Sequence, residues 1–100
     1  MKVLQYVSIF CLFVLLGTDE AYATLVSGKV SGTNGEDLAY ANVYVKGTSN
    51  GTTTNINGVY KLEIPEGPCV LVFRYLGYKM KMEPIEVTSA PITINIQLDR

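Results

Sequence analysis

The sequence lacks the side chains on which most catalytic and metal sites depend. Its 100 residues include no histidine, no tryptophan and only two cysteines, Cys11 and Cys69. Without an imidazole there is no base to activate Cys69 or a serine, and the histidine-containing ligand sets of catalytic zinc cannot form. The carboxylates are spread over predicted turns and outward strand positions instead of meeting in an apolar pocket: Glu36, Asp37, Glu63, Glu66, Glu83 and Glu86. We therefore predict a protein that is not an enzyme and that binds neither a metal nor a cofactor.

An excess of charge of either sign is also missing. The 8 basic and 9 acidic residues give a net charge of −1. Removing Lys2, Asp19 and Glu20 with the N-terminal segment leaves equal numbers of both signs. Because no basic patch and no basic amphipathic helix is present, nucleic acid and a membrane surface are not the expected partners.

The N-terminal segment has the layout of a secretory signal peptide. Met1-Lys2 is followed by the apolar run 3–16 and by Ala21-Tyr22-Ala23, a small-x-small cleavage pattern. We predict residues 1–23 as the signal peptide, cleaved between Ala23 and Thr24, and residues 24–100 as one domain. An uncleaved anchor is the alternative, although the apolar run is shorter than the roughly 20 residues of a membrane span.

The two cysteines do not suggest a disulfide within the domain. Cys11 lies inside the apolar run without the small residue before it that a lipoprotein cysteine requires. After cleavage only Cys69 remains. It either pairs between molecules or is a small, buried residue at the start of a strand.

Beyond Thr24 the apolar residues fall at spacing two, in short runs separated by turn formers. We expect strands at 25–30, 40–46, 52–55, 59–64, 69–75, 78–87 and 92–98. One face of each run is apolar, as in two sheets that close over one core. The sequence therefore predicts an all-β, antiparallel Greek-key β-sandwich of about seven strands.

Particular residues are assigned within these strands. Leu71 belongs to the most apolar run, which we expect at the centre of a sheet, and Pro84 indicates a bulge or an edge strand. The inward positions are expected to be Val26, Gly28, Val30, Val43, Val45, Tyr60, Leu62, Ile64 and the isoleucines of 92–98.

The stretch 47–67, rich in glycine, asparagine and threonine, raises the question of a ligand loop. Counted from Asn55, position twelve of a calcium loop would be Glu66, beyond a strand and a proline, and the other ligands would be neutral amides. The glycines lack the spacing of a phosphate loop, and no helix follows them. We interpret the stretch as turns around an exposed edge strand at Thr52–Thr54, with Gly58 at positive φ.

Five segments in this order resemble the carboxypeptidase-regulatory-like domain family: SGKV at 27–30, ANVYVKGT at 41–48, GTTTNINGVY at 51–60, IPEG at 64–67 and LVFRYLGY at 71–78. The resemblance covers essentially the whole mature chain and implies a transthyretin-like, Ig-like sandwich. Asn55 stands where the family usually has Asp, and either side chain can make the same turn. The family-motif and turn residues are Gly28, Val30, Asn42, Gly47, Thr48, Gly51, Thr54, Asn55, Gly58, Tyr60, Pro65, Gly67, Leu71, Gly77 and Tyr78.

This family commonly forms the N-terminal extension of TonB-dependent outer-membrane receptors in Bacteroidetes-type bacteria. The resemblance thus implies an exported, non-catalytic domain that takes part in transport. Its place would be the periplasm or the periplasmic face of the outer membrane. The chain would be either free-standing or a fragment of a longer receptor.

The implied partner is a protein of the envelope, such as an outer-membrane barrel in the same chain. A partner strand could add to the edge at Thr52–Thr54 or to the strand of Pro84, unless both are simply protected edges. A carbohydrate-binding or adhesive module is the alternative, and its candidate aromatic residues are Tyr40, Tyr44, Tyr75 and Tyr78.

Overall fold

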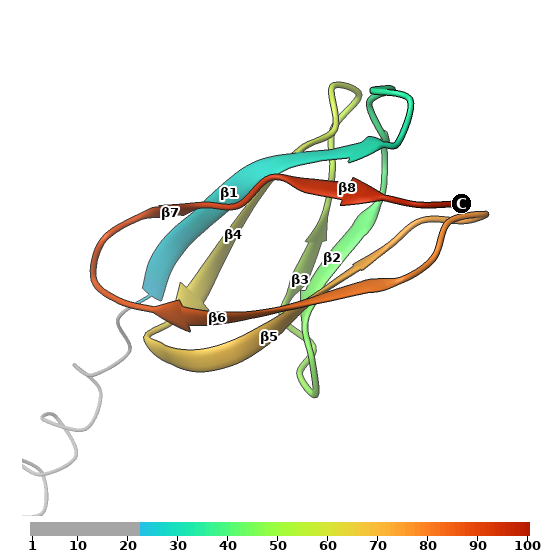
Figure 1. The fold of residues 1–100 in the computed structure, drawn as a ribbon. Coiled ribbons are helices and arrows are strands. Elements are labelled where there is room, and N and C mark those ends of the chain that lie inside the picture. Colours follow the sequence, from blue (N-terminus) through green and yellow to red (C-terminus); the bar gives the residue numbers. More distant parts are fainter. Residues whose placement is uncertain (1–22) are drawn as a thin grey trace, which may run out of the picture.

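The computed structural model describes residues 23–100, which form two four-stranded sheets packed into an open sandwich (Figure 1). In the first sheet β1 (Ala23–Gly32) lies between β4 (Val59–Pro65) on one side and β7 (Ile92–Thr93) and β8 (Ile96–Leu98) on the other. The second sheet has the order β3 (Gly51–Thr53), β2 (Asn42–Val45), β5 (Gly67–Arg74), β6 (Lys81–Val87). The predicted all-β sandwich is confirmed.

The predicted signal peptide lies outside the described residues, except for Ala23, which begins β1 together with Thr24. Among residues 23–100 there is no helix with the length and apolar character needed to cross a membrane.

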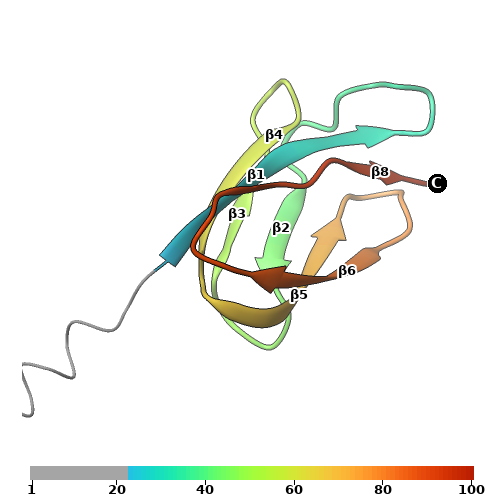
Figure 2. The ribbon, with the colours of Figure 1, turned by 60° about the vertical axis from the view of Figure 1, so that its left-hand side comes forward.

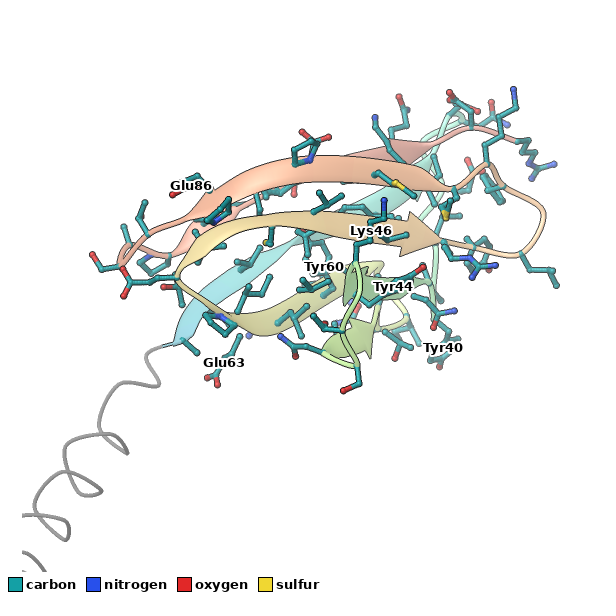
Figure 3. All side chains as sticks on the ribbon, turned by 90° about the horizontal axis from the view of Figure 1, so that it is seen from below. Tyr40, Tyr44, Lys46, Tyr60, Glu63 and Glu86 are labelled. Carbon is teal, nitrogen blue, oxygen red and sulfur yellow. The ribbon has the colours of Figure 1, made fainter. Side chains whose placement is uncertain are left out.

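The core lies between the sheets and follows the period-two pattern of the sequence. In β4, buried Tyr60, Leu62 and Ile64 alternate with residues that are exposed or half-buried. Leu71 and Phe73 of β5 are fully buried against them from the other sheet. The rings of Tyr60 and Phe73 meet edge to face, with centroids 5.6 Å apart, and Figure 3 shows Tyr60 in the interior. The predicted core positions and the central place of β5 are therefore confirmed.

The strand predicted at 92–98 is interrupted and pairs in an unexpected direction. It consists of β7 and β8, which both run parallel to β1, with Val26 opposite Ile92 and Val30 opposite Ile96. The other strand pairs are antiparallel. In Figure 1 β7 lies beside the first part of β1 and β8 beside its last part, and Figure 2 shows β8 alongside β1 from another side.

Three local predictions are corrected by the structure. Thr54 is not on an exposed strand: it is 1% exposed, accepts the Ala41 N–H at its hydroxyl and donates to the Leu38 carbonyl. The strand predicted from Tyr40 begins only at Asn42. Tyr40 precedes it with a φ of 63° and is 67% exposed. The strand predicted from residue 78 begins only at Lys81, because a turn occupies the preceding residues.

Candidate functional site

The motif residues Gly28 and Tyr60 meet where β7 gives way to β8. The Tyr60 hydroxyl donates to the Ile94 carbonyl at 2.7 Å. That carbonyl lies directly over Gly28, since a Cβ on Gly28 would be only 1.8 Å from the Ile94 oxygen. The Ile94 carbonyl is thus turned toward the core, and Asn95 Oδ1 accepts the Lys29 N–H at 3.0 Å in its place. This arrangement explains the interruption of the last strand.

Burial has a clear effect on Tyr60. Desolvation raises the pKa of Tyr60 to about 12, so the hydroxyl keeps its proton and donates at any ordinary pH. An unfolded tyrosine ionises near pH 10. Because the folded pKa is higher, the stabilisation is complete below about pH 10 and is lost as the pH rises toward about 12.

Replacing Tyr60 with phenylalanine should lower the free energy of unfolding by about 1–3 kcal/mol. The ring would still fill the core, but the Ile94 carbonyl would lose its donor in a partly buried setting. Urea unfolding followed by circular dichroism would measure the loss. Tyr44→Phe, at a tyrosine for which no hydroxyl hydrogen bond is found among the described residues, is the matched control and should change little; equal effects at both positions would contradict the assignment.

A second motif turn is built on Asn55. Its Oδ1 accepts the N–H groups of Asn57 and Val59 at 2.9 and 3.0 Å, which confirms that asparagine makes the turn here. Gly58 has a φ of 77°, as predicted, and its carbonyl accepts the Val30 N–H of β1. Asn55 and Gly58 therefore stabilise the turn before β4, in line with the interpretation of the stretch 47–67 as turns.

The other motif residues also lie in turns or strands. Thr48 donates to the Val45 carbonyl within the β2–β3 turn. Gly47, Gly67 and Gly77 have positive φ. Val30 and Leu71 are buried, Asn42 and Gly51 begin β2 and β3, Pro65 ends β4, and Tyr78 lies in the β5–β6 turn.

The predicted edge strands are both poor templates for a partner strand. The Val70 carbonyl accepts the Lys46 N–H, so Val70 directs its backbone hydrogen-bonding groups away from β6. Pro84 stands opposite Val70 on β6, and its ring nitrogen therefore lies on the outer side of β6, away from β5. Pro84 thus removes the donor from the middle of this edge, and the prediction that it marks an edge strand is confirmed.

On the opposite side of the sandwich the edge strands β3 and β4 disfavour strand addition for other reasons. β3 has only three residues. The outward groups of β4 are partly occupied, because Val59 pairs with Asn55 and the Glu63 carbonyl accepts from Asn50 Nδ2 at 3.0 Å. Short strands, covered groups and an edge proline are the means by which sheets avoid strand addition. The interpretation as protected edges is therefore favoured for both edges.

The outer surface of the second sheet is different. We name it the Tyr44 face; it comprises Asn42, Tyr44, Lys46, Val70, Val72, Arg74 and Met82. Tyr44, Val72 and Met82 stand in one cross-strand row. Val72 is 1% exposed but lies outside the core cluster, so its burial comes from larger neighbours on the outside. Sequence reasoning missed this row because a buried valine on either face looks the same.

Arg74 lies between two adjoining hollows at the end of this face. One hollow is lined by Tyr44, Gly51 and Thr53, the other by Leu76 and Met80, and both share Asn42 and Arg74. Leu76 is 96% exposed and Met80 50%. These residues form a shallow surface with Arg74 at its centre, a mostly polar hollow beside Tyr44 on one side and the exposed apolar side chains of Leu76 and Met80 on the other.

The β5–β6 turn is held to the rest of the fold by Tyr78. Its hydroxyl donates to Glu36 Oε1 at 2.6 Å and accepts from Arg100 Nε at 3.2 Å. This hydrogen bond from Tyr78 is the main reason why the pKa of the Glu36 carboxyl is below its usual value. The Tyr78 ring packs edge to face on Tyr75, so these two tyrosines do not offer the flat platform expected of a glycan site.

The titratable groups of the described domain are spread over the fold. Among residues 23–100 no group of three or more histidine, cysteine, aspartate or glutamate side chains could hold a metal. The one salt bridge found there joins Lys29 and Asp37 at 2.8 Å on the surface. Cys69 is a half-buried thiol whose pKa is raised by burial, which lowers its reactivity.

Comparison with known proteins agrees with this geometry. The sequence profile of the CarboxypepD_reg-like domain matches residues 26–100. The TonB-dependent receptor P26 of Formosa agariphila is 40% identical over 78 residues, which cover 78% of this chain and 7% of the receptor. The receptor SusC of Bacteroides thetaiotaomicron is 38% identical over 60 residues, covering 60% of this chain and 6% of the receptor. The chain thus corresponds to a small part of these receptors.

Solved structures share the fold at low identity. One chain in each of two interface mutants of a type II cohesin–X-dockerin complex from Acetivibrio cellulolyticus superposes with TM-scores of 0.67 and 0.65. The identities are 17% and 18%, and the match covers 75% of this chain and 56% of the other in both cases. This likeness shows the β-sandwich alone.

Proposed function

Because the chain belongs to the carboxypeptidase-regulatory-like domain family, we propose that it is the non-catalytic N-terminal accessory domain of a TonB-dependent outer-membrane receptor, or a free-standing relative that works beside one. The domain resembles the N-terminal region of such receptors. Its work is contact with another protein of the envelope. No substrate chemistry is assigned to it.

This proposal rests on which groups the side chains of the motif residues bind. Tyr60, Thr54, Thr48 and Asn55 all direct their side-chain hydrogen bonds to backbone groups of their own chain. The family signature therefore encodes a scaffold. Contact with a partner is left to side chains on the surface, as expected of an accessory domain.

We also propose that the chain is exported by the signal peptide predicted at residues 1–23. Thr24 is 5% exposed, and its hydroxyl donates to the Thr88 carbonyl. The residue that directly follows the predicted cleavage point is thus already part of the packed fold. The mature domain would lie in the periplasm or on the periplasmic face of the outer membrane.

Fractionation of the cell envelope tests both statements. An antibody against residues 24–100 would be used to blot inner-membrane, periplasmic and outer-membrane fractions of the source organism. The proposal expects a band of receptor size in the outer membrane, or a band of domain size that co-purifies with a receptor, and a mature N-terminus at Thr24. A cytoplasmic band that retains Met1 would contradict it.

A further inference from the structure

We propose that the Tyr44 face is a docking site for an acidic segment of a partner protein that also carries apolar side chains. The inference rests on the proposed function, since the partner is sought among envelope proteins. It adds the surface and the chemistry of that partner. Three observations lead to it: an apolar outer row, two cations without a carboxylate partner among residues 23–100, and edges of the second sheet that disfavour strand addition.

The apolar row is unusual for the outside of a sandwich. The outer face of an antiparallel sheet normally carries polar side chains, and the first sheet has Ser27, Lys29 and Lys61 there beside the apolar Leu25 and Val59. On the second sheet the outer positions of the central strand β5 are Val70 and Val72. Val72 is itself covered, and the half-buried Tyr44 and Val70 and the exposed Met82 surround it in an apolar patch that crosses β2, β5 and β6.

The cations decide the charge of the occupant. Lys46 and Arg74 are exposed on either side of the apolar row. Neither has a carboxylate within 4.0 Å in residues 23–100, because the salt bridge found there joins other residues. Figure 3 places Glu63 and Glu86 toward the far end of the sandwich, away from Tyr44 and Lys46. A partner that brings carboxylates would therefore meet complementary charge.

The mode of binding follows from the edges. Strand addition is disfavoured by Pro84 on β6 and by the short β3. An occupant lying across the strands instead meets Arg74 between the two hollows, where a carboxylate can pair with the guanidinium. Apolar side chains on either side of that carboxylate then reach Tyr44 in one hollow and Leu76 and Met80 in the other.

The experiment is photo-cross-linking of the full chain in its own cell envelope. A benzoylphenylalanine would replace Tyr44, and in a matched strain Lys61, which is exposed on the outer face of the other sheet. We expect an adduct from position 44 and only background from position 61. The cross-linked peptide should carry more aspartate and glutamate than lysine and arginine.

Charge reversal makes the test specific. Lys46→Glu with Arg74→Glu should lower the adduct yield about tenfold. Lys29→Glu with Lys61→Glu changes the net charge equally and should leave the yield at position 44 unchanged. Raising the salt concentration of isolated envelopes from about 0.05 M to about 1 M should also lower the adduct yield at position 44, because screening weakens exposed charge pairs. A protease-resistance assay on each variant confirms that it is folded.

Several outcomes would overturn the inference: equal adducts at positions 44 and 61, an adduct that ignores Lys46→Glu with Arg74→Glu, or an adduct to lipid or to a second copy of the chain. These results leave the proposed function standing if the blot finds the chain with a receptor in the outer membrane. A chain absent from the envelope would instead reject the proposed function itself.

Discussion

Replacing Gly28 with alanine should lower the free energy of unfolding by at least about 3 kcal/mol, and in a domain of this size it could prevent folding. The new Cβ would lie 1.8 Å from the Ile94 oxygen and 2.6 Å from its carbon. The obstacle is backbone, so no rotamer change can remove it. The chain would have to withdraw the Ile94 carbonyl and thereby lose the hydrogen bond from Tyr60. Urea or thermal unfolding followed by circular dichroism would measure the effect.

The control for this prediction is the neighbouring position. Ser27→Ala alters the same strand on its other face and should cost well under half as much. A double-mutant cycle with Tyr60→Phe then tests the mechanism. If alanine acts by displacing the Ile94 carbonyl, removal of the Tyr60 hydroxyl should cost less in the Gly28→Ala background than in the native one. Strict additivity of the two losses would sink this explanation, even if Gly28→Ala is strongly destabilising.

Replacing Gly58 with valine should be nearly as damaging, with an expected loss of about 3 kcal/mol or more. A β-branched residue is a steric outlier at a φ of 77°. In addition, its Cβ would lie 2.6 Å from the Val30 carbonyl oxygen of β1. The substitution therefore strains the turn and pushes the turn away from the strand that it joins. The shift of the thermal midpoint gives the size of the effect.

Gly47 offers a matched comparison, because the two contributions can be separated there. It has a φ of 80°, and a Cβ at that position would meet nothing within 4 Å. Gly47→Val should thus show the conformational strain alone, and Gly58→Val should exceed it by about 1–3 kcal/mol. Equal losses would mean that contact with Val30 contributes nothing. An unchanged midpoint for Gly58→Val would contradict the turn itself.

The sequence was most informative where one short segment decides its own structure. The alternation from Tyr60 to Ile64 predicted a half-buried strand, and Asn57-Gly58 predicted the turn before it; both are confirmed. These features depend on neighbours along the chain. The same holds for Pro84, whose missing donor restricts it to an edge whatever the rest of the fold does.

The features that sequence analysis missed depend on residues far apart in the chain. Nothing in the alternation of 92–98 indicates a parallel partner, since period two is common to both directions of pairing. The inward turn at Ile94 is set by Tyr60, 34 positions away. Thr54 resembled an edge threonine, but its hydroxyl satisfies buried groups of Leu38 and Ala41. The role of such residues becomes evident only when the three-dimensional structure shows their distant partners.

The Tyr44 face could be found only in part from the sequence. Val43 and Val45 were predicted to point inward, and they do; Tyr44 and Lys46, which alternate with them, therefore lie on the outer face. Arg74 and Met82 were not connected with them, because strands β2, β5 and β6 are brought side by side by the sheet. A recognition surface that spans three strands has no local signature.

The parallel pairing of β1 with β7 and β8 also determines how the domain responds to mechanical load. The first strand begins at one end of the sandwich and the last strand finishes at the other (Figure 1). A pull applied to these two strand ends runs along both strands in opposite directions. The hydrogen bonds between them are then loaded in shear and must break together, whereas a hairpin would open one bond at a time. Rupture under tension is governed by the unfolding rate, and this geometry places the resistance in the strands that flank the Gly28–Tyr60–Ile94 contact.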